Sequence, residues 1–312
     1  MSKPKVLLTT KIPSSVLATL EAACDVDYND SNSFPHGELL ARVSGKQGLI
    51  CVITDSITPD VLEAGRDLKV VSNIAVGYNN IDVAAARERA IAVTNTPDVL
   101  TEATADMAWA LILDITRRVS EGDRLVRRGG WKGWALDFML GTDLRGKQLG
   151  IIGYGRIGRA VGTRAAAFGM RVAYFDLHLG ADPIAMPLDR LLATSDVVSI
   201  HCPLTPETRH LINQASLARM KRSAYLINTA RGPVVDERAL AWALKNRIIS
   251  GAALDVYEEE PKVHPDLLEL DNVVLAPHLG SATTETRTAM ADLAVRNAIA
   301  VLTGLPPITP VA

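Results

Sequence analysis

The chain has 312 residues, of which 48% are hydrophobic and 22% charged, with a formal net charge of −2 at pH 7. This length allows two domains, whereas the near-neutral charge, the absence of an apolar segment long enough to span a bilayer and the lack of a signal-peptide pattern argue against nucleic-acid and membrane partners. The three widely spaced cysteines, without a C-x-x-C pair, argue against a disulfide framework or a metal site and favour the cytoplasm: Cys24, Cys51 and Cys202.

The first part of the chain alternates short apolar runs with helical patterns, as parallel α/β sheets do. Thr58 followed by Pro59 and an acid is typical of a helix start, and Asp82 can cap a helix over residues 84–89. We expect strands between these helices over residues 6–9, 48–53, 70–73 and 92–94.

Two long helical patterns, over residues 101–128 and 283–303, flank the second half of the chain. They suggest that a cofactor domain is inserted into a first domain that resumes near the end. We therefore expect a substrate-binding domain built from residues 1–100 and 284–312, and a cofactor-binding domain over residues 101–283. A cleft between two such domains would hold the substrate.

A loop-like segment over residues 129–146 carries the aromatic side chains of Trp131, Trp134 and Phe138. Two interpretations are open. The aromatic residues are buried under the loop, or they form an exposed arm that contacts a second subunit or the substrate.

A glycine turn follows the apolar run that ends at residue 152. Gly153, Gly155 and Gly158 have the spacing G-x-G-x-x-G. The first glycine permits a tight strand-to-helix turn, the second lets a pyrophosphate approach the backbone, and the third lets the helix pack closely on the strand. A second strand over residues 172–175 then leads to Asp176, at roughly the 20-residue offset of an acid that binds ribose hydroxyls. Together these features predict a dinucleotide site.

The acid at the end of that second strand also predicts which dinucleotide binds. The carboxylate of Asp176 would repel the 2′-phosphate of NADP, and the residues that follow, Leu177, His178 and Leu179, offer no arginine to bind it. We therefore predict NADH in preference to NADPH. Arg156, inside the glycine turn, is expected to contact the pyrophosphate.

Three polar side chains follow three further predicted strands. Reduction of a 2-oxo acid needs a cation for the carboxylate, an acid/base that titrates near neutral pH, and a carboxylate that orients this base. These groups are supplied by Arg231, Glu260 and His278. Arg231 follows residues 225–230, a strand that ends in a polar turn, and the other two come after strands over residues 251–254 and 273–275. Each residue alone could be a surface or packing residue. Because parallel strands end at one edge, the three together favour a site.

Five motifs of the chain resemble those of the D-isomer-specific 2-hydroxyacid dehydrogenase family: VGYNNID at 76–82, HCPLT at 201–205, NTARG at 228–232, DVYEEEP at 255–261 and PHLGSAT at 277–283. The resemblance implies an α/β fold of two doubly wound domains, a Rossmann cofactor domain inserted into a discontinuous flavodoxin-like substrate domain. It also implies a homodimer formed through the cofactor domain.

The resemblance assigns a role to each candidate residue. His278 would be the acid/base, Glu260 its orienting carboxylate and Arg231 a substrate ligand, while backbone N–H groups around Val76 and Gly77 would bind the substrate carboxylate. With the glycine turn, the expected cofactor contacts are Thr104, Gly153, Gly155, Arg156, Ile157, Gly158, Asp176, Pro203, Thr208, Thr229, Ala230, Asp255 and Gly280.

The motif over residues 94–106 and the tryptophan pair in the 129–146 segment are most similar to glyoxylate/hydroxypyruvate reductases. The expected reaction is therefore NAD(P)H-dependent reduction of glyoxylate or hydroxypyruvate to the 2-hydroxy acid. Many such reductases prefer NADPH, and Asp176 departs from that preference. The alternatives are a D-3-phosphoglycerate, D-lactate or phosphite dehydrogenase and, more remotely, a non-catalytic NAD sensor that resembles transcriptional corepressors.

Overall fold

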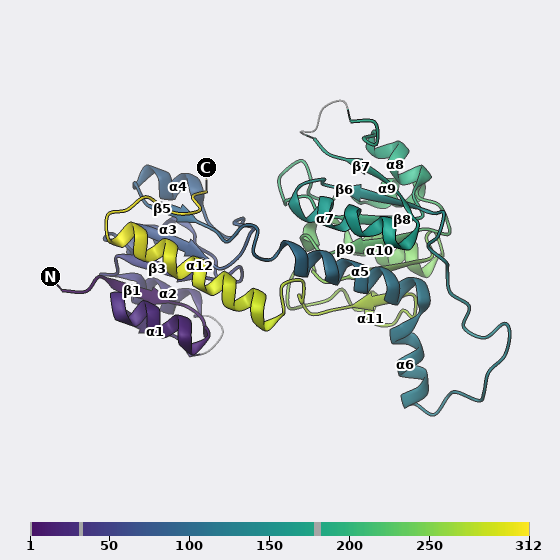
Figure 1. Ribbon diagram of the computed structural model, residues 1–312, viewed down its shortest axis with the longest axis horizontal. Coiled ribbons are helices and arrows are strands. Elements are labelled where there is room, and N and C mark those ends of the chain that lie inside the picture. The colour runs from purple at the N-terminus through teal and green to yellow at the C-terminus, as the bar shows by residue number, and fades with distance from the viewer. Residues whose placement is uncertain (1, 31–33, 178–181, 312) are drawn as a thin grey trace. The chain divides into compact units, whose positions relative to one another are not determined.

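A computed structural model describes residues 2–30, 34–177 and 182–311. The chain divides into two compact units (Figure 1). Unit 1 consists of Met1–Leu100 and Thr283–Ala312, and unit 2 of Thr101–Ala282.

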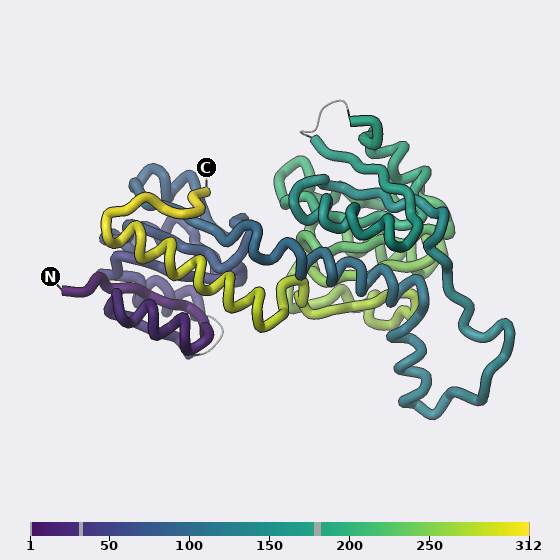
Figure 2. The backbone as a smooth tube through the Cα atoms, viewed as in Figure 1, coloured from purple at the N-terminus to yellow at the C-terminus, as the bar shows by residue number. Residues whose placement is uncertain are grey.

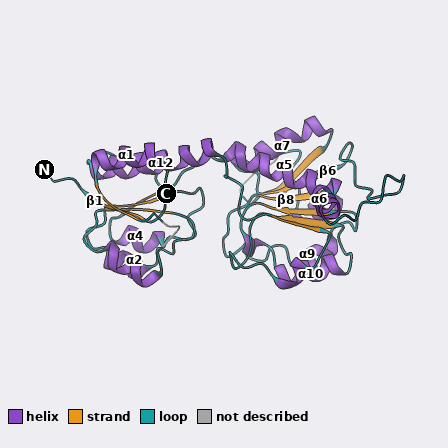
Figure 3. Cartoon of the chain, turned by 90° about the horizontal axis from the view of Figure 1, so that it is seen from below, coloured by secondary structure: helices purple, strands orange, loops and turns teal. Residues whose placement is uncertain are grey.

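Unit 1 is built on a parallel sheet with the strand order β2-β1-β3-β4-β5. This is the flavodoxin-like order. Four of its five strands are mostly buried, because helices cover both faces of the sheet (Figure 3). The strands are β1 (Lys5–Leu8), β2 (Asp25–Tyr28), β3 (Gly48–Cys51), β4 (Val70–Asn73) and β5 (Ala92–Thr94).

The helices of unit 1 form two layers around this sheet. One core cluster joins the sheet to α1 (Ser14–Ala23) and α12 (Thr284–Leu302). A second joins it to α2 (His36–Val43), α3 (Pro59–Ala64) and α4 (Val83–Glu88).

The helix starts and four of the five strands of unit 1 are confirmed. Asp82 accepts a hydrogen bond from the N–H of Ala85 at 2.8 Å and so caps α4, and Pro59 begins α3. The strand β2, which lies at the edge of the sheet, was not predicted from the sequence. Two of its four residues are aspartates, and such a polar pattern gives little sign of a buried strand.

Unit 2 contains a six-stranded parallel sheet with the order β11-β10-β9-β8-β6-β7. The order reverses at β6, which pairs with β7 on one side and β8 on the other, so ligands are expected at this switch point. This sheet confirms the second doubly wound fold. Its strands are β6 (Gln148–Ile152), β7 (Arg171–Phe175), β8 (Val197–Ile200), β9 (Tyr225–Asn228), β10 (Gly251–Leu254) and β11 (Val273–Leu275).

Helices also cover both faces of the unit 2 sheet (Figure 3). On one face lie α5 (Thr101–Arg117) and α7 (Arg156–Ala165), which the short helix η1 (Ala166–Phe168) extends. The core cluster of the other face includes α8 (Leu188–Thr194), α9 (Gln214–Arg219), α10 (Glu237–Lys245) and α11 (Pro265–Leu268).

The prediction of one continuous helix over residues 101–128 is wrong. The chain forms α5 and then α6 (Val119–Arg127), with Arg118 between them at a left-handed φ of 60°. Two contacts explain the break. The carbonyl of Thr116, which would accept from Ser120 in a continuous helix, accepts from the N–H of Thr142 at 2.8 Å. The carboxylate of Asp114 instead accepts from the N–H of Ser120 at 2.7 Å.

The aromatic residues after α6 are exposed. Trp134 keeps 81% of its surface accessible, Trp131 55% and Phe138 41%. The interpretation as buried loop aromatics is therefore wrong, and the segment is an exposed apolar arm.

Candidate active site

The glycine turn after β6 has the geometry of a dinucleotide site. Gly153 adopts a φ of 89°, and a Cβ atom there would lie 2.5 Å from the backbone nitrogen of Cys202. A Cβ at Gly158 would lie 2.1 Å from the carbonyl oxygen of Gly153, so α7 packs directly on the turn. At Gly155, by contrast, a Cβ would meet nothing within 4 Å. The N-terminus of α7 is thus open where a pyrophosphate would approach, and the chain fits the cofactor.

Asp176 lies beside this turn, at the end of β7. Its Oδ2 atom accepts a hydrogen bond from the N–H of Tyr154 at 2.8 Å, and the residue is half-buried. His178 and Leu179, two of the residues on which the prediction of NADH rests, lie outside the described residues. At the start of α7, Arg156 is exposed and Ile157 packs on the unit 2 core.

The loop after β8 is closed by a threonine. The hydroxyl of Thr208 donates to the carbonyl of Pro203 at 2.7 Å and accepts from the N–H of Thr205 at 2.8 Å. Thr208 is buried, so its hydroxyl fixes the shape of this loop. Pro203 thereby keeps its place at the carboxyl end of the sheet.

A histidine that was not among the predicted site residues joins the ends of β8 and β9. His201 contacts the hydroxyl of Ser199 through Nε2 at 2.8 Å and that of Thr229 through Nδ1 at 3.4 Å. Burial lowers the pKa of His201 to about 3, so the ring stays neutral. Thr229 and Ala230 then lead into the segment that carries Arg231. The contact between Ser199 and His201 could have been predicted, because the two residues are two positions apart at the end of one strand.

The turn that presents His278 is held by a buried aspartate. Both carboxylate oxygens of Asp255 accept backbone N–H groups, from Leu279 at 2.6 Å and from Gly280 at 2.7 Å. Burial raises the pKa of Asp255, although these two hydrogen bonds oppose that effect. A Cβ at Gly280 would lie 3.5 Å from Thr104 of α5. Three predicted cofactor residues from distant segments, Thr104, Asp255 and Gly280, are therefore adjacent.

His278 is hydrogen-bonded to Glu260. The Nδ1 atom of His278 lies 2.8 Å from Oε2 of Glu260, and Oε1 accepts from the N–H of Tyr257 at 3.1 Å. Burial alone would raise the pKa of Glu260, but His278, the Tyr257 N–H and the charge of Arg231 together lower it below its usual range. The carboxylate is thus ionised at neutral pH and accepts the Nδ1 proton. The contact to Glu260 uses Nδ1 of His278 and leaves the other ring nitrogen, Nε2, outside this hydrogen bond.

Arg231 extends from the end of β9 next to this pair. Its backbone carbonyl accepts from Asn228 at 3.0 Å, and its Nη1 donates to the carbonyl of Ala230 at 2.6 Å. Burial lowers the pKa of Arg231, and the charge of Glu260 opposes this shift. A Cβ at Gly232 would lie 1.8 Å from the backbone of Tyr257, so the two loops are in contact. The structure therefore brings the three strand-end residues together.

Val76 and Gly77 lie in unit 1, in the loop after β4. The side chain of Asn95 donates to the carbonyl of Val76 at 2.8 Å, and that of Asn73 donates to the carbonyl of Gly77 at 2.9 Å. Neither asparagine was among the site residues predicted from the sequence. Their position, at or directly after a strand end, is the signal that could have identified them.

The chain matches a known protein family over most of unit 2. Residues 109–280 match the family model described as D-isomer specific 2-hydroxyacid dehydrogenase, NAD binding domain. The chain belongs to this family.

Relatives and solved structures of the family match almost the whole chain. The glyoxylate reductase of Thermofilum pendens is 48% identical over 320 residues, covering 98% of this chain and 94% of that protein. The TT0316 protein from Thermus thermophilus is 47% identical with a TM-score of 0.94, covering 99% and 100% of the two chains. The NADPH-dependent glyoxylate/hydroxypyruvate reductase from Sinorhizobium meliloti, solved with NADP and malonate, is 36% identical with a TM-score of 0.91, covering 100% and 97%.

Membership makes the chain an oxidoreductase that uses a nicotinamide cofactor. The matched residues all lie in unit 2, with the glycine turn and the three strand-end side chains. Within the described ranges, no helix has both the length and the apolar composition that crossing a membrane requires.

Proposed function

We propose that this enzyme reduces glyoxylate or hydroxypyruvate to the corresponding 2-hydroxy acid, with NADH as the preferred cofactor. The observation that carries the proposal is the pairing of His278 with an ionised Glu260, within reach of the charge of Arg231. Such a set can reduce a 2-oxo acid: the histidine protonates the carbonyl oxygen, the glutamate orients the histidine, and the arginine binds the substrate carboxylate. The names of the relatives support the substrate class.

In the proposed mechanism, His278 acts as general acid. When bound, the reduced nicotinamide supplies a hydride to the carbonyl carbon of the substrate. The carbonyl oxygen takes a proton from Nε2 of His278, whose Nδ1–H stays bonded to Glu260. The Glu260 carboxylate stabilises the imidazolium before that transfer, and solvent restores the proton afterwards. Arg231 binds the substrate carboxylate through its planar guanidinium and polarises the ketone.

We assign the two binding tasks to different units. The backbone N–H groups around Val76 and Gly77 in unit 1 would bind the substrate carboxylate. Unit 2 would bind the cofactor through the glycine turn and the strand ends, with contacts from Thr104, Arg156, Ile157, Asp176, Pro203, Thr208, Thr229, Ala230, Asp255 and Gly280.

A substrate panel tests this function. Glyoxylate, hydroxypyruvate, pyruvate and 3-phosphohydroxypyruvate would each be assayed with NADH and with NADPH. The expected result is the highest kcat/KM for glyoxylate or hydroxypyruvate, with D-glycerate formed from hydroxypyruvate. A preference for the phosphorylated substrate would identify a phosphoglycerate dehydrogenase instead, and the absence of turnover with all four would contradict the proposal.

Asp176→Asn is expected to lower the NADH-to-NADPH ratio of kcat/KM about tenfold or more, because it removes the charge that repels a 2′-phosphate. Asparagine keeps an oxygen that can accept from the N–H of Tyr154, so the glycine turn should keep its shape. Steady-state kinetics with both cofactors measure the ratio. Asp182→Asn, a nearby acid outside the turn, is the control, and an equal change in that variant would contradict the role of Asp176.

We further propose a cytoplasmic homodimer formed through α6 and the arm over residues 129–146. Helix α6 has no buried residue. In the arm, the exposed fraction of the residue surface is 81% for Trp134 and 82% for Leu136. A second copy of this chain would cover such a surface. Cys24, Cys51 and Cys202 are free buried thiols, which supports a reducing compartment.

Leu136→Asp is expected to shift the protein from dimer to monomer, because a charge would be buried in the interface. Analytical ultracentrifugation measures the mass. Leu305→Asp, at an exposed leucine of unit 1, is the matched control and should leave the dimer intact. A wild-type protein that sediments as a monomer would refute this assembly.

A further inference from the structure

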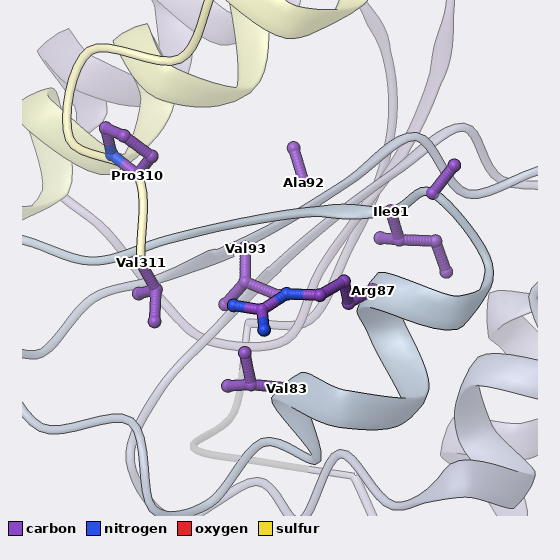
Figure 4. A pocket seen from close by; sticks show the side chains of 8 residues that line it. Val83, Arg87, Ile91, Ala92, Val93, Pro310 and Val311 are labelled. Carbon is purple, nitrogen blue, oxygen red and sulfur yellow. The ribbon is translucent and has the colours of Figure 1, made fainter.

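The C-terminal tail, residues 304–311, turns back from α12 and runs beside β5 (Figure 2). The N–H of Val311 donates to the carbonyl of Val93 at 2.8 Å, and Pro310 forms an antiparallel bridge with Thr94. Figure 4 shows Pro310 and Val311 on the tail next to Val93. Because Val311 also packs on the unit 1 core, the tail has a fixed register along the strand.

One buried amide on α12 holds the tail in place. The Oδ1 atom of Asn297 accepts from the N–H groups of Ile308 and Thr309, both at 2.9 Å. Its Nδ2 atom donates to the hydroxyl of Thr309 at 2.8 Å and to the carbonyl of Leu293 at 2.9 Å. The side chain is fully buried and uses both acceptor positions and both donors, so Thr309 is tightly positioned.

Thr309 in turn positions Asn95. Its hydroxyl donates to the carbonyl of Asn95 at 2.6 Å, and the N–H of Asn95 donates to the carbonyl of Thr309 at 3.3 Å. Both backbone polar groups of Asn95 are therefore bonded to the same residue of the tail. The side chain of Asn95 then reaches the carbonyl of Val76 at 2.8 Å. Asn95 thus links the tail to the loop after β4.

The carbonyls of three successive residues, 75–77, all point into unit 1. They accept from the N–H of Thr96, the side chain of Asn95 and the side chain of Asn73, at 2.9, 2.8 and 2.9 Å. In a trans peptide the N–H points opposite to the carbonyl, so the N–H groups of residues 76–78 are turned away from these contacts. None of the three has an intramolecular acceptor in the part of the chain that the structure describes. They are donors in position for an anion.

We infer that the C-terminal tail positions this loop for the substrate, and that Thr309 and Asn95 are positioning residues of the reaction. The inference rests on the proposed role of the loop in binding the substrate carboxylate. Without the hydroxyl of Thr309, the backbone of Asn95 would keep only its N–H contact to the tail. Asn95 would then hold the peptide between Val76 and Gly77 less firmly, and the N–H groups would have to be ordered when the substrate binds. We expect the loss in substrate binding, because the tail and the loop that it positions belong to unit 1, whereas the residues assigned to proton transfer belong to unit 2.

Thr309→Val tests the inference, since valine keeps the shape of the side chain and loses its hydroxyl. The expected result is a KM for glyoxylate about tenfold higher, with kcat changed less than about twofold. The Kd of NADH, measured by fluorescence, should not change, because the glycine turn lies in unit 2. Thr309→Ser, which keeps the hydroxyl, should restore the wild-type KM.

Thr303→Val is the matched control. The hydroxyl of Thr303 donates to the carbonyl of Ile299 within α12, at 2.8 Å, and does not contact the loop. Equal KM values in Thr309→Val and Thr303→Val would overturn the inference. If Thr309→Val fails to fold, Asn95→Asp removes the donor to Val76 while the tail stays docked, and should raise KM in the same way.

Hydrogen–deuterium exchange separates this inference from the proposed function. Exchange of the peptide that covers residues 74–80 should accelerate in Thr309→Val and not in Thr303→Val, whatever the substrate is. A wild-type enzyme inactive on glyoxylate and hydroxypyruvate would refute the proposed function alone. Unchanged exchange in Thr309→Val would refute the role of the tail alone.

Discussion

Replacement of His278 by asparagine is expected to reduce kcat about 10²–10⁴-fold, the usual contribution of a positioned general acid. The imidazole is the group that protonates the substrate oxygen in the proposed mechanism, and an amide cannot take over this proton transfer. His278 has a left-handed φ of 56°, which asparagine tolerates better than alanine does, so the turn should keep its shape. Stopped-flow measurement of a single turnover would show the loss in the chemical step.

The control for this variant is His36→Asn. His36 also has a carboxylate partner, Asp60, at 2.8 Å, but it lies in unit 1, whereas His278 and Glu260 lie in unit 2. It should keep wild-type turnover, and both variants should bind NADH with unchanged affinity. A His278→Asn enzyme that loses NADH binding and turnover to the same extent would contradict the role of His278 as general acid.

The candidate site could be located from the sequence because it depends on strand ends. Arg231, Glu260 and His278 are distant in the chain, yet each follows a buried strand, and parallel strands bring their carboxyl ends to one edge. The glycine turn could also be predicted from the sequence. At Gly153 and Gly158 a side chain would collide with the backbone, so glycine is required at a fixed spacing. For the same reason the two doubly wound sheets could be predicted from alternating strand and helix patterns.

The remaining features depend on contacts that no local pattern encodes. The break at Arg118 follows from the N–H of Thr142, which occupies a carbonyl of α5 from a segment beyond α6. The roles of Asn95 and Thr309 follow from the return of the tail to β5, a pairing between residues separated by 214 positions. His201 has a pKa of about 3 because of its burial at the switch point, which requires the folded sheet. These are tertiary effects, which depend on segments that are distant in the chain.

Substitution of Arg231 is expected to have the second largest effect, and two variants separate its charge from its shape. Arg231→Lys keeps the charge but loses the planar pair of donors that binds a carboxylate at two points. We expect kcat/KM for glyoxylate to fall about 10²–10³-fold, the usual effect of removing a donor that stabilises a developing negative charge. Steady-state kinetics measure this loss, and NADH binding should remain close to that of the wild type.

Arg231→Gln should lose at least as much activity and should also change the pH profile. The charge of Arg231 helps to hold the pKa of Glu260 below its usual range, so its removal raises that pKa. Glu260 must be ionised to accept the Nδ1 proton of His278, and activity is lost as the pH falls through the pKa of Glu260. The acid limb of kcat against pH should therefore move to higher pH in Arg231→Gln and stay in place in Arg231→Lys. Identical profiles in the two variants would show that the guanidinium charge does not act on this carboxylate.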